Sequence, residues 1–111
     1  MILDREWVLT ALGDHSSPTG AGGRPATLRL ESATKRASGF AGCNRYGATY
    51  VLTADSLRFG PSMSTKMACA EGDELERAFL AALAAVSTYQ VSDSTLSLMG
   101  SGGVVARFKA R

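Results

Sequence analysis

The sequence predicts an α+β fold, made predominantly of antiparallel strands with one amphipathic helix. Short segments of alternating polar and apolar residues recur between Gly-, Ser- and Asp-containing turns, which is typical of a meander of strands. A single segment instead repeats its apolar residues at helical intervals. Because strands and helices do not alternate regularly, a doubly wound parallel sheet is disfavoured.

The first half of the chain contains most of the expected strands. Residues 7–12 mix aromatic and β-branched side chains and stop at a Gly-Asp turn, and a flexible Gly- and Ser-rich loop is expected at residues 16–23. Residues 26–31 place two leucines on one face and Arg29 and Glu31 on the other, as in a half-buried strand. Shorter strands are expected at residues 36–40, 46–52 and 56–59.

The predicted helix covers about residues 70–86. This segment is free of Gly and Pro from Asp73 onward and carries one apolar stripe, formed by Leu75, Phe79, Ala82, Leu83 and Val86. Asp73 followed by Glu76 resembles a capping box, in which the two residues satisfy free N–H groups of the first turn. We therefore expect the helix to begin between Ala70 and Asp73.

Three more strands are expected after the helix, at residues 88–91, 95–99 and 104–109. In the last of them, Arg107, Lys109 and Arg111 alternate with Phe108 and Ala110, which indicates one solvated strand face. The chain has 111 residues, 45% hydrophobic and 20% charged, so we expect residues 1–111 to form a single globular domain.

The charge pattern does not predict a nucleic-acid partner. The net charge is +2, and the basic residues are spread along the chain without forming a stripe. No run approaches the roughly 20 apolar residues of a membrane helix, and the start of the chain lacks the pattern of a leader peptide. We expect a monomer without a transmembrane segment, and any leader to be absent from this chain.

A family resemblance is carried by two short motifs. The first is Ser38-Gly39-Phe40-Ala41-Gly42-Cys43-Asn44-Arg45-Tyr46, and the second is Thr65-Lys66-Met67-Ala68-Cys69. Together they resemble the signature of the META domain, or HslJ-like heat-shock, family. The signature residues are Gly39, Gly42, Cys43, Asn44, Tyr46, Thr65, Lys66, Met67, Ala68 and Cys69.

Residues outside the two motifs extend the resemblance over nearly the whole chain. They are Trp7-x-Leu9, Glu76-x-x-Phe79-x-x-x-Leu83, Tyr89, Leu96-x-Leu98 and Phe108. One departure is Ala70, where family members often carry Pro, and it affects only the expected start of the helix.

The resemblance implies a sheet wrapped toward a barrel, with one helix packed on it. It also implies a non-catalytic module that is either located in the cell envelope (periplasm or outer membrane), often as a lipoprotein, or secreted. Such relatives are associated with heat stress, and their molecular activity is undefined. No catalytic residue or cofactor is carried over, and the expected partner is an unknown protein or envelope component.

Cys43 and Cys69 are the only cysteines, and three states are open for them. They form a disulfide, which would close a loop of roughly 27 residues and stabilise the fold by about 3 kcal/mol. Alternatively they are two buried thiols, or one is a reactive thiol of an enzyme. No metal site is expected, because two cysteines and the lone His15 are too few for a tetrahedral zinc.

The remaining signature residues favour structural roles. We expect Gly39 and Gly42 to permit a left-handed backbone or a close strand approach, and Asn44 to cap its own turn. Lys66 is expected to face solvent. Four aromatic residues are candidates for a groove that would bind a small ligand or peptide, although aromatics on strands more often fill the core: Trp7, Tyr46, Tyr50 and Phe59.

Overall fold

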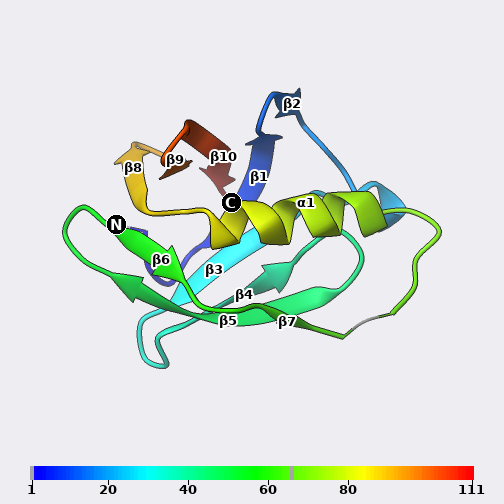
Figure 1. Ribbon diagram of the computed structural model, residues 1–111, viewed down its shortest axis with the longest axis horizontal. Coiled ribbons are helices and arrows are strands. Elements are labelled where there is room, and N and C mark those ends of the chain that lie inside the picture. The colour runs from blue at the N-terminus through cyan, green and yellow to red at the C-terminus, as the bar shows by residue number, and fades with distance from the viewer. Residues whose placement is uncertain (1, 66) are drawn as a thin grey trace.

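The computed structural model describes residues 2–65 and 67–111, and its strands form one antiparallel sheet (Figure 1). The strands are β1 (Glu6–Leu12), β2 (His15–Ser16), β3 (Thr27–Glu31), β4 (Arg36–Phe40), β5 (Arg45–Leu52), β6 (Leu57–Phe59), β7 (Met63–Ser64), β8 (Thr88–Ser92), β9 (Thr95–Gly100) and β10 (Gly103–Ala110). Their order in the sheet is β6-β5-β4-β3-β1-β10-β9-β8, with β2 beside β1 and β7 beside β5.

The sheet curls until its two ends almost meet. Ser56 and Thr88 form an isolated antiparallel bridge, and the Leu57 N–H donates to the Ser87 carbonyl oxygen at 3.2 Å, so β6 and β8 approach each other at one point. This contact pairs only a small part of the two edge strands, so the sheet is nearly but not fully closed. The α+β class and the barrel-like wrap are therefore confirmed.

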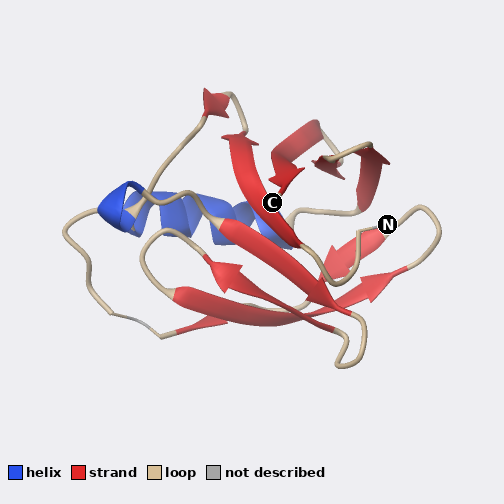
Figure 2. Ribbon diagram, turned by 180° about the vertical axis from the view of Figure 1, so that it is seen from behind, coloured by secondary structure: helices blue, strands red, loops and turns tan. Residues whose placement is uncertain are grey.

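The helix α1 (Asp73–Ala84) lies across the mouth of the wrapped sheet, between the β3–β5 side and the β8–β10 side (Figure 1). Its buried stripe is Leu75, Phe79 and Leu83. The Phe79 ring packs edge-on against Tyr46 of β5 and Phe108 of β10, with ring centroids 5.6 and 6.1 Å apart. Seen from behind, strands cross in front of one end of this helix, and most of it stays in view (Figure 2).

The structure places the helix start at Asp73, within the predicted range, and corrects the predicted end from about Val86 to Ala84. Helical hydrogen bonding gives way to a tighter turn after Ala84, where the Ala85 and Val86 N–H groups donate to Ala82 and Leu83 oxygens. The capping-box prediction is wrong, because the N-cap residue is Gly72, with φ 97°, and it has no side chain to cap the first turn. Asp73 is thus the first helical residue. The Glu76 side chain does not cap the helix and instead accepts hydrogen bonds from the N–H groups of Cys43 and Asn44.

The strand predictions need only small changes. A 3-10 turn, η1 (Ala21–Gly23), and the two-residue β2 lie within or beside the expected loop, and β7 was not predicted. In β10, Ala106 and Phe108 are buried while Arg107 and Lys109 are exposed, which confirms the solvated face. Within residues 2–65 and 67–111, no helix has the length and apolar content needed to cross a membrane.

Candidate functional site

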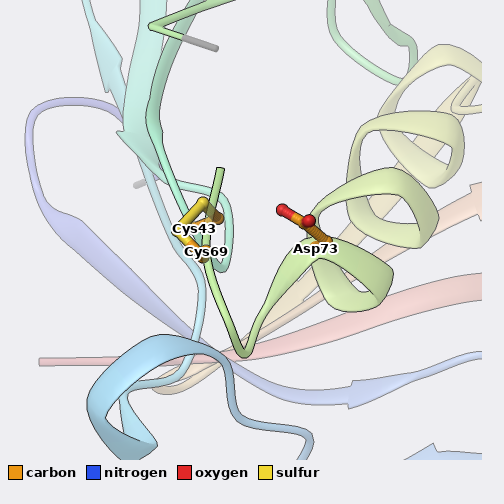
Figure 3. A group of neighbouring side chains, drawn as sticks. All are labelled: Cys43, Cys69 and Asp73. Atoms are coloured by element: carbon orange, nitrogen blue, oxygen red, sulfur yellow. A yellow bond between two sulfur atoms is a disulfide. The ribbon is translucent and has the colours of Figure 1, made fainter. Parts of the chain in front are cut away.

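A disulfide joins the two signature motifs. Cys43, in the turn between β4 and β5, is bonded to Cys69, in the segment before α1, with their Cα atoms 6.0 Å apart (Figure 3). Of the three states left open by the sequence, the structure has the disulfide. Since these are the only two cysteines of the chain, neither is free in this state.

Asp73 lies beside the disulfide. Its carboxylate and the two sulfurs lie within 4.8 Å of one another (Figure 3), so three groups of metal-ligating type meet here. The sulfurs, however, are bonded to each other and carry no thiolate charge, which metal binding by cysteine requires. His15 is exposed on β2 and does not belong to this group. The arrangement is therefore a covalent link and not a metal centre.

Asn44 holds the two motifs together next to the disulfide. Its side-chain oxygen accepts hydrogen bonds from the Thr65 hydroxyl at 2.7 Å and the Met67 N–H at 2.9 Å. Its side-chain amide donates to the Met67 carbonyl at 3.2 Å and to Glu76 Oε2 at 3.0 Å. Asn44 is only 3% exposed, and it uses all four hydrogen-bonding positions of its side chain.

Glu76 of α1 is the second centre of this network. Its Oε1 accepts the backbone N–H groups of Cys43, at 3.2 Å, and of Asn44, at 2.6 Å. A carboxylate that accepts several N–H groups forms charge-assisted hydrogen bonds, which are stronger than neutral ones. The helix, the β4–β5 turn and the segment before the helix are thereby fixed at one point.

Three glycines permit a close backbone contact at the same junction. Gly42 has φ 129°, and its carbonyl oxygen accepts the Ala21 N–H at 2.7 Å. A Cβ atom on Gly20 or on Gly72 would overlap this Gly42 oxygen. The left-handed backbone expected at Gly42 is confirmed, whereas Gly20 and Gly72 were not recognised from the sequence.

A second close approach involves Gly39 on β4. A Cβ atom there would overlap the Thr27 carbonyl oxygen on β3, so the expected close strand approach is confirmed. The same oxygen accepts the Tyr46 hydroxyl at 2.8 Å, and the Thr27 hydroxyl oxygen accepts the Phe40 N–H at 2.9 Å. Burial raises the pKa of Tyr46 far above its ordinary value, so this residue stays a hydrogen-bond donor.

The candidate groove aromatics lie mainly in the core. Trp7, Tyr46 and Tyr50 are at most 6% exposed, and Phe59 packs against the same cluster. Burial, followed by the charges of Asp4 and Glu31, also raises the pKa of Tyr50. Tyr50 also lines a hollow of about 410 Å³ with Leu3, Lys35, Val51 and Leu52, whereas Trp7, Tyr46 and Phe59 contribute to the core packing.

The remaining signature residues surround the network. Thr65 and Met67 bond to Asn44, Ala68 is exposed, and Lys66 lies outside the described residues. The prediction that the Asn44 side chain bonds within its own turn is wrong. It bonds instead to residues more than 20 positions away in the sequence. Sequence reasoning also missed Thr27 and the true partner of Glu76, although Glu76 stood in the family pattern.

Comparison with known proteins agrees with the geometry. The META domain family model matches residues 1–111. An NMR structure of a protein from Burkholderia xenovorans is similar, with a TM-score of 0.78 and 33% sequence identity over 99% of this chain and 83% of that chain. A second NMR structure shares the fold, with a TM-score of 0.73 and 20% identity over 97% of this chain and 90% of the other. No curated protein matches.

Proposed function

The chain belongs to the META domain family, and on that premise we propose that it is a non-catalytic, stress-associated interaction module of the cell envelope or secreted space. The observation that carries this proposal is the Cys43–Cys69 disulfide. Structural disulfides persist in oxidising compartments and are rare in reducing ones. An envelope or extracellular position accounts for a link placed at the junction of three segments.

The chemistry of the junction supports an architectural role. The polar groups of Asn44 and Glu76 are used to hold the backbone of other segments, which leaves them poorly placed to act on a substrate. A thiol enzyme needs a thiolate nucleophile, and both cysteines are bonded to each other. A ligand carrier would need interior space, and three of the four candidate aromatics are instead part of the buried core cluster.

The exposed apolar residues beside the junction offer a surface for a protein partner. Met63, on β7, is 74% exposed, and Met67, next to the disulfide-bonded segment, is 63% exposed. Flexible methionine side chains are common at surfaces that bind other proteins. The disulfide and Asn44 hold the backbone that presents Met67, so a partner would meet a partly preorganised surface.

Thiol trapping in intact cells tests the compartment. Cells are quenched with acid and alkylated with a maleimide of high mass, with and without prior reduction. We expect the native chain to take up no label without reductant and two labels after reduction. Two labels without reductant would place the chain in a reducing compartment and contradict the proposal.

Affinity capture from envelope extract tests the interaction. Wild-type chain is compared with a Met63→Ser/Met67→Ser variant, and Val51→Ser is the matched control because Val51 is an exposed apolar residue, 67% exposed, on β5. We expect the wild-type chain to capture an envelope protein. The double variant should no longer capture this protein, and the Val51→Ser control should still capture it. No enriched protein, together with unchanged heat tolerance of a deletion strain, contradicts the proposal.

A further inference from the structure

A hollow with a basic rim lies on the outer face of the sheet. Trp7, Leu28 and Tyr46 belong to the interior cluster, and side chains alternate along a strand, so their neighbours Glu6, Thr27 and Arg45 face outward. The hollow has a volume of about 460 Å³ and is lined by Glu6, Gly23, Arg24, Pro25, Thr27, Phe40, Arg45 and Arg111.

Phe40 forms an apolar floor in this hollow. It pairs with Arg45 across β4 and β5 and is outside the interior cluster, yet only 7% of it is exposed. The Arg24 guanidinium covers it, with its central carbon 4.1 Å from the ring centroid. The Arg24 Nε also donates to the Ala21 oxygen at 3.4 Å, so this guanidinium has contacts on two sides.

The charges in the hollow do not balance. Arg111 pairs with Glu6, at 2.6 Å between Nε and Oε1, which neutralises the Glu6 carboxylate. Within residues 2–65 and 67–111, neither Arg24 nor Arg45 has a carboxylate within ion-pair distance. Two guanidinium groups with unused donors therefore face one concave space.

We propose that this hollow binds an oxyanion group, a phosphate or a carboxylate, carried by a small molecule or glycan. Arg24 and Arg45 are the ligands, because a guanidinium presents paired N–H donors that match two oxygens of such a group. Because Arg24 already contacts Phe40 and Ala21 in the free chain, its side chain loses less conformational entropy when a ligand binds. This site goes beyond the proposed function, since it depends on neither the compartment nor a protein partner.

The test is an NMR titration of the intact, disulfide-bonded chain at constant ionic strength. The probes are inorganic phosphate and acetate, with glycerol as an uncharged control. We expect saturable shifts at the amides of Gly23, Arg24, Phe40 and Arg45, with a Kd on the order of a millimolar for an exposed two-arginine site. Tighter binding of phosphate identifies a phosphate ligand, and tighter binding of acetate identifies a carboxylate.

Variants separate a built site from general attraction of anions. Arg24→Gln and Arg45→Gln are each expected to weaken binding about tenfold, as the loss of one charge-assisted contact implies. Arg58→Gln is the matched control, because Arg58 is exposed on β6 and outside the hollow. Unsaturable shifts, shifts spread equally to Arg58 and Arg107, or a wild-type Kd in both variants would overturn the proposal. Failed envelope capture would leave this result unaffected.

Discussion

Glu76 of α1 accepts a hydrogen bond at 2.6 Å from the backbone N–H of Asn44, which lies 32 residues earlier in the chain. The same carboxylate accepts the Asn44 side-chain amide at 3.0 Å. A single residue of the helix therefore fixes both the backbone and the side chain of the β4–β5 turn. This contact, together with the disulfide, makes the two signature motifs one structural unit.

Removing the Glu76 carboxylate should destabilise the fold more than any ordinary surface change. Glu76→Ala leaves the N–H groups of Cys43 and Asn44 without an acceptor, and we expect the free energy of unfolding to fall by about 2–3 kcal/mol. Urea denaturation measures this. Glu74→Ala is the control, since Glu74 is exposed in the same helical turn. Equal losses in both variants would contradict the role of Glu76.

Asn44→Asp tests the need for the side-chain amide with almost no change of shape. The new carboxylate cannot donate to the Met67 carbonyl or to Glu76, and it places a second negative charge beside that carboxylate. We expect a loss of about 3 kcal/mol at pH 7. A variant as stable as wild type at pH 7 contradicts this account.

The sequence predicted the elements well because their signals are local. The alternation of Leu28 and Leu30 with Arg29 and Glu31 follows directly from the pleat of a strand, and the spacing of Phe79 and Leu83 follows from the helix. The sheet order was not predicted, since β1 pairs with β10 through contacts such as Leu9 with Phe108, almost the whole chain apart. Only the family resemblance implied that the sheet is wrapped.

The site was predicted in part, for the same reason. Gly42 and Cys43 were identified because a signature motif marks them. Glu76 was assigned to a local capping box, and Asn44 to its own turn, since short-range patterns offer only short-range partners. Both residues in fact bond to segments far away in sequence, and no spacing in a single sequence encodes that choice.

Reduction of the disulfide should weaken the fold without unfolding it. On the chain-entropy model, a link between residues 26 positions apart stabilises by about 3 kcal/mol. The bonds from Asn44 to Glu76 and Met67 do not need the sulfurs, so the native fold should persist. Urea denaturation with and without reductant measures the difference. A Cys43→Ala/Cys69→Ala variant should be insensitive to reductant, and a wild-type midpoint that reductant leaves unchanged contradicts the prediction.

Gly72→Ala should be strongly destabilising, because two constraints meet at Gly72. Its φ of 97° is unfavourable for a residue with a Cβ atom, and that atom would overlap the Gly42 carbonyl oxygen. We expect thermal and urea unfolding to show a loss of at least about 2 kcal/mol. Gly102→Ala is the matched control, since a Cβ there meets nothing within 4 Å. Similar stability of the two variants would show that the backbone at Gly72 adjusts freely.

Tyr46 should make the stability of the fold sensitive to alkaline pH. Burial raises its pKa in the folded state above the ordinary value of 10.0, so the folded chain retains a proton that the unfolded chain loses. Its contribution to stability is therefore fully present below about pH 10 and declines as the pH rises further.

Tyr46→Phe removes the 2.8 Å bond to the Thr27 carbonyl, and we expect it to lower the free energy of unfolding at pH 7 by about 1 kcal/mol. The variant should then lose less stability than wild type from pH 10 upward, because the other titrating groups are common to both. Urea denaturation across this range measures the two curves, and parallel curves would mean that Tyr46 is not the group responsible.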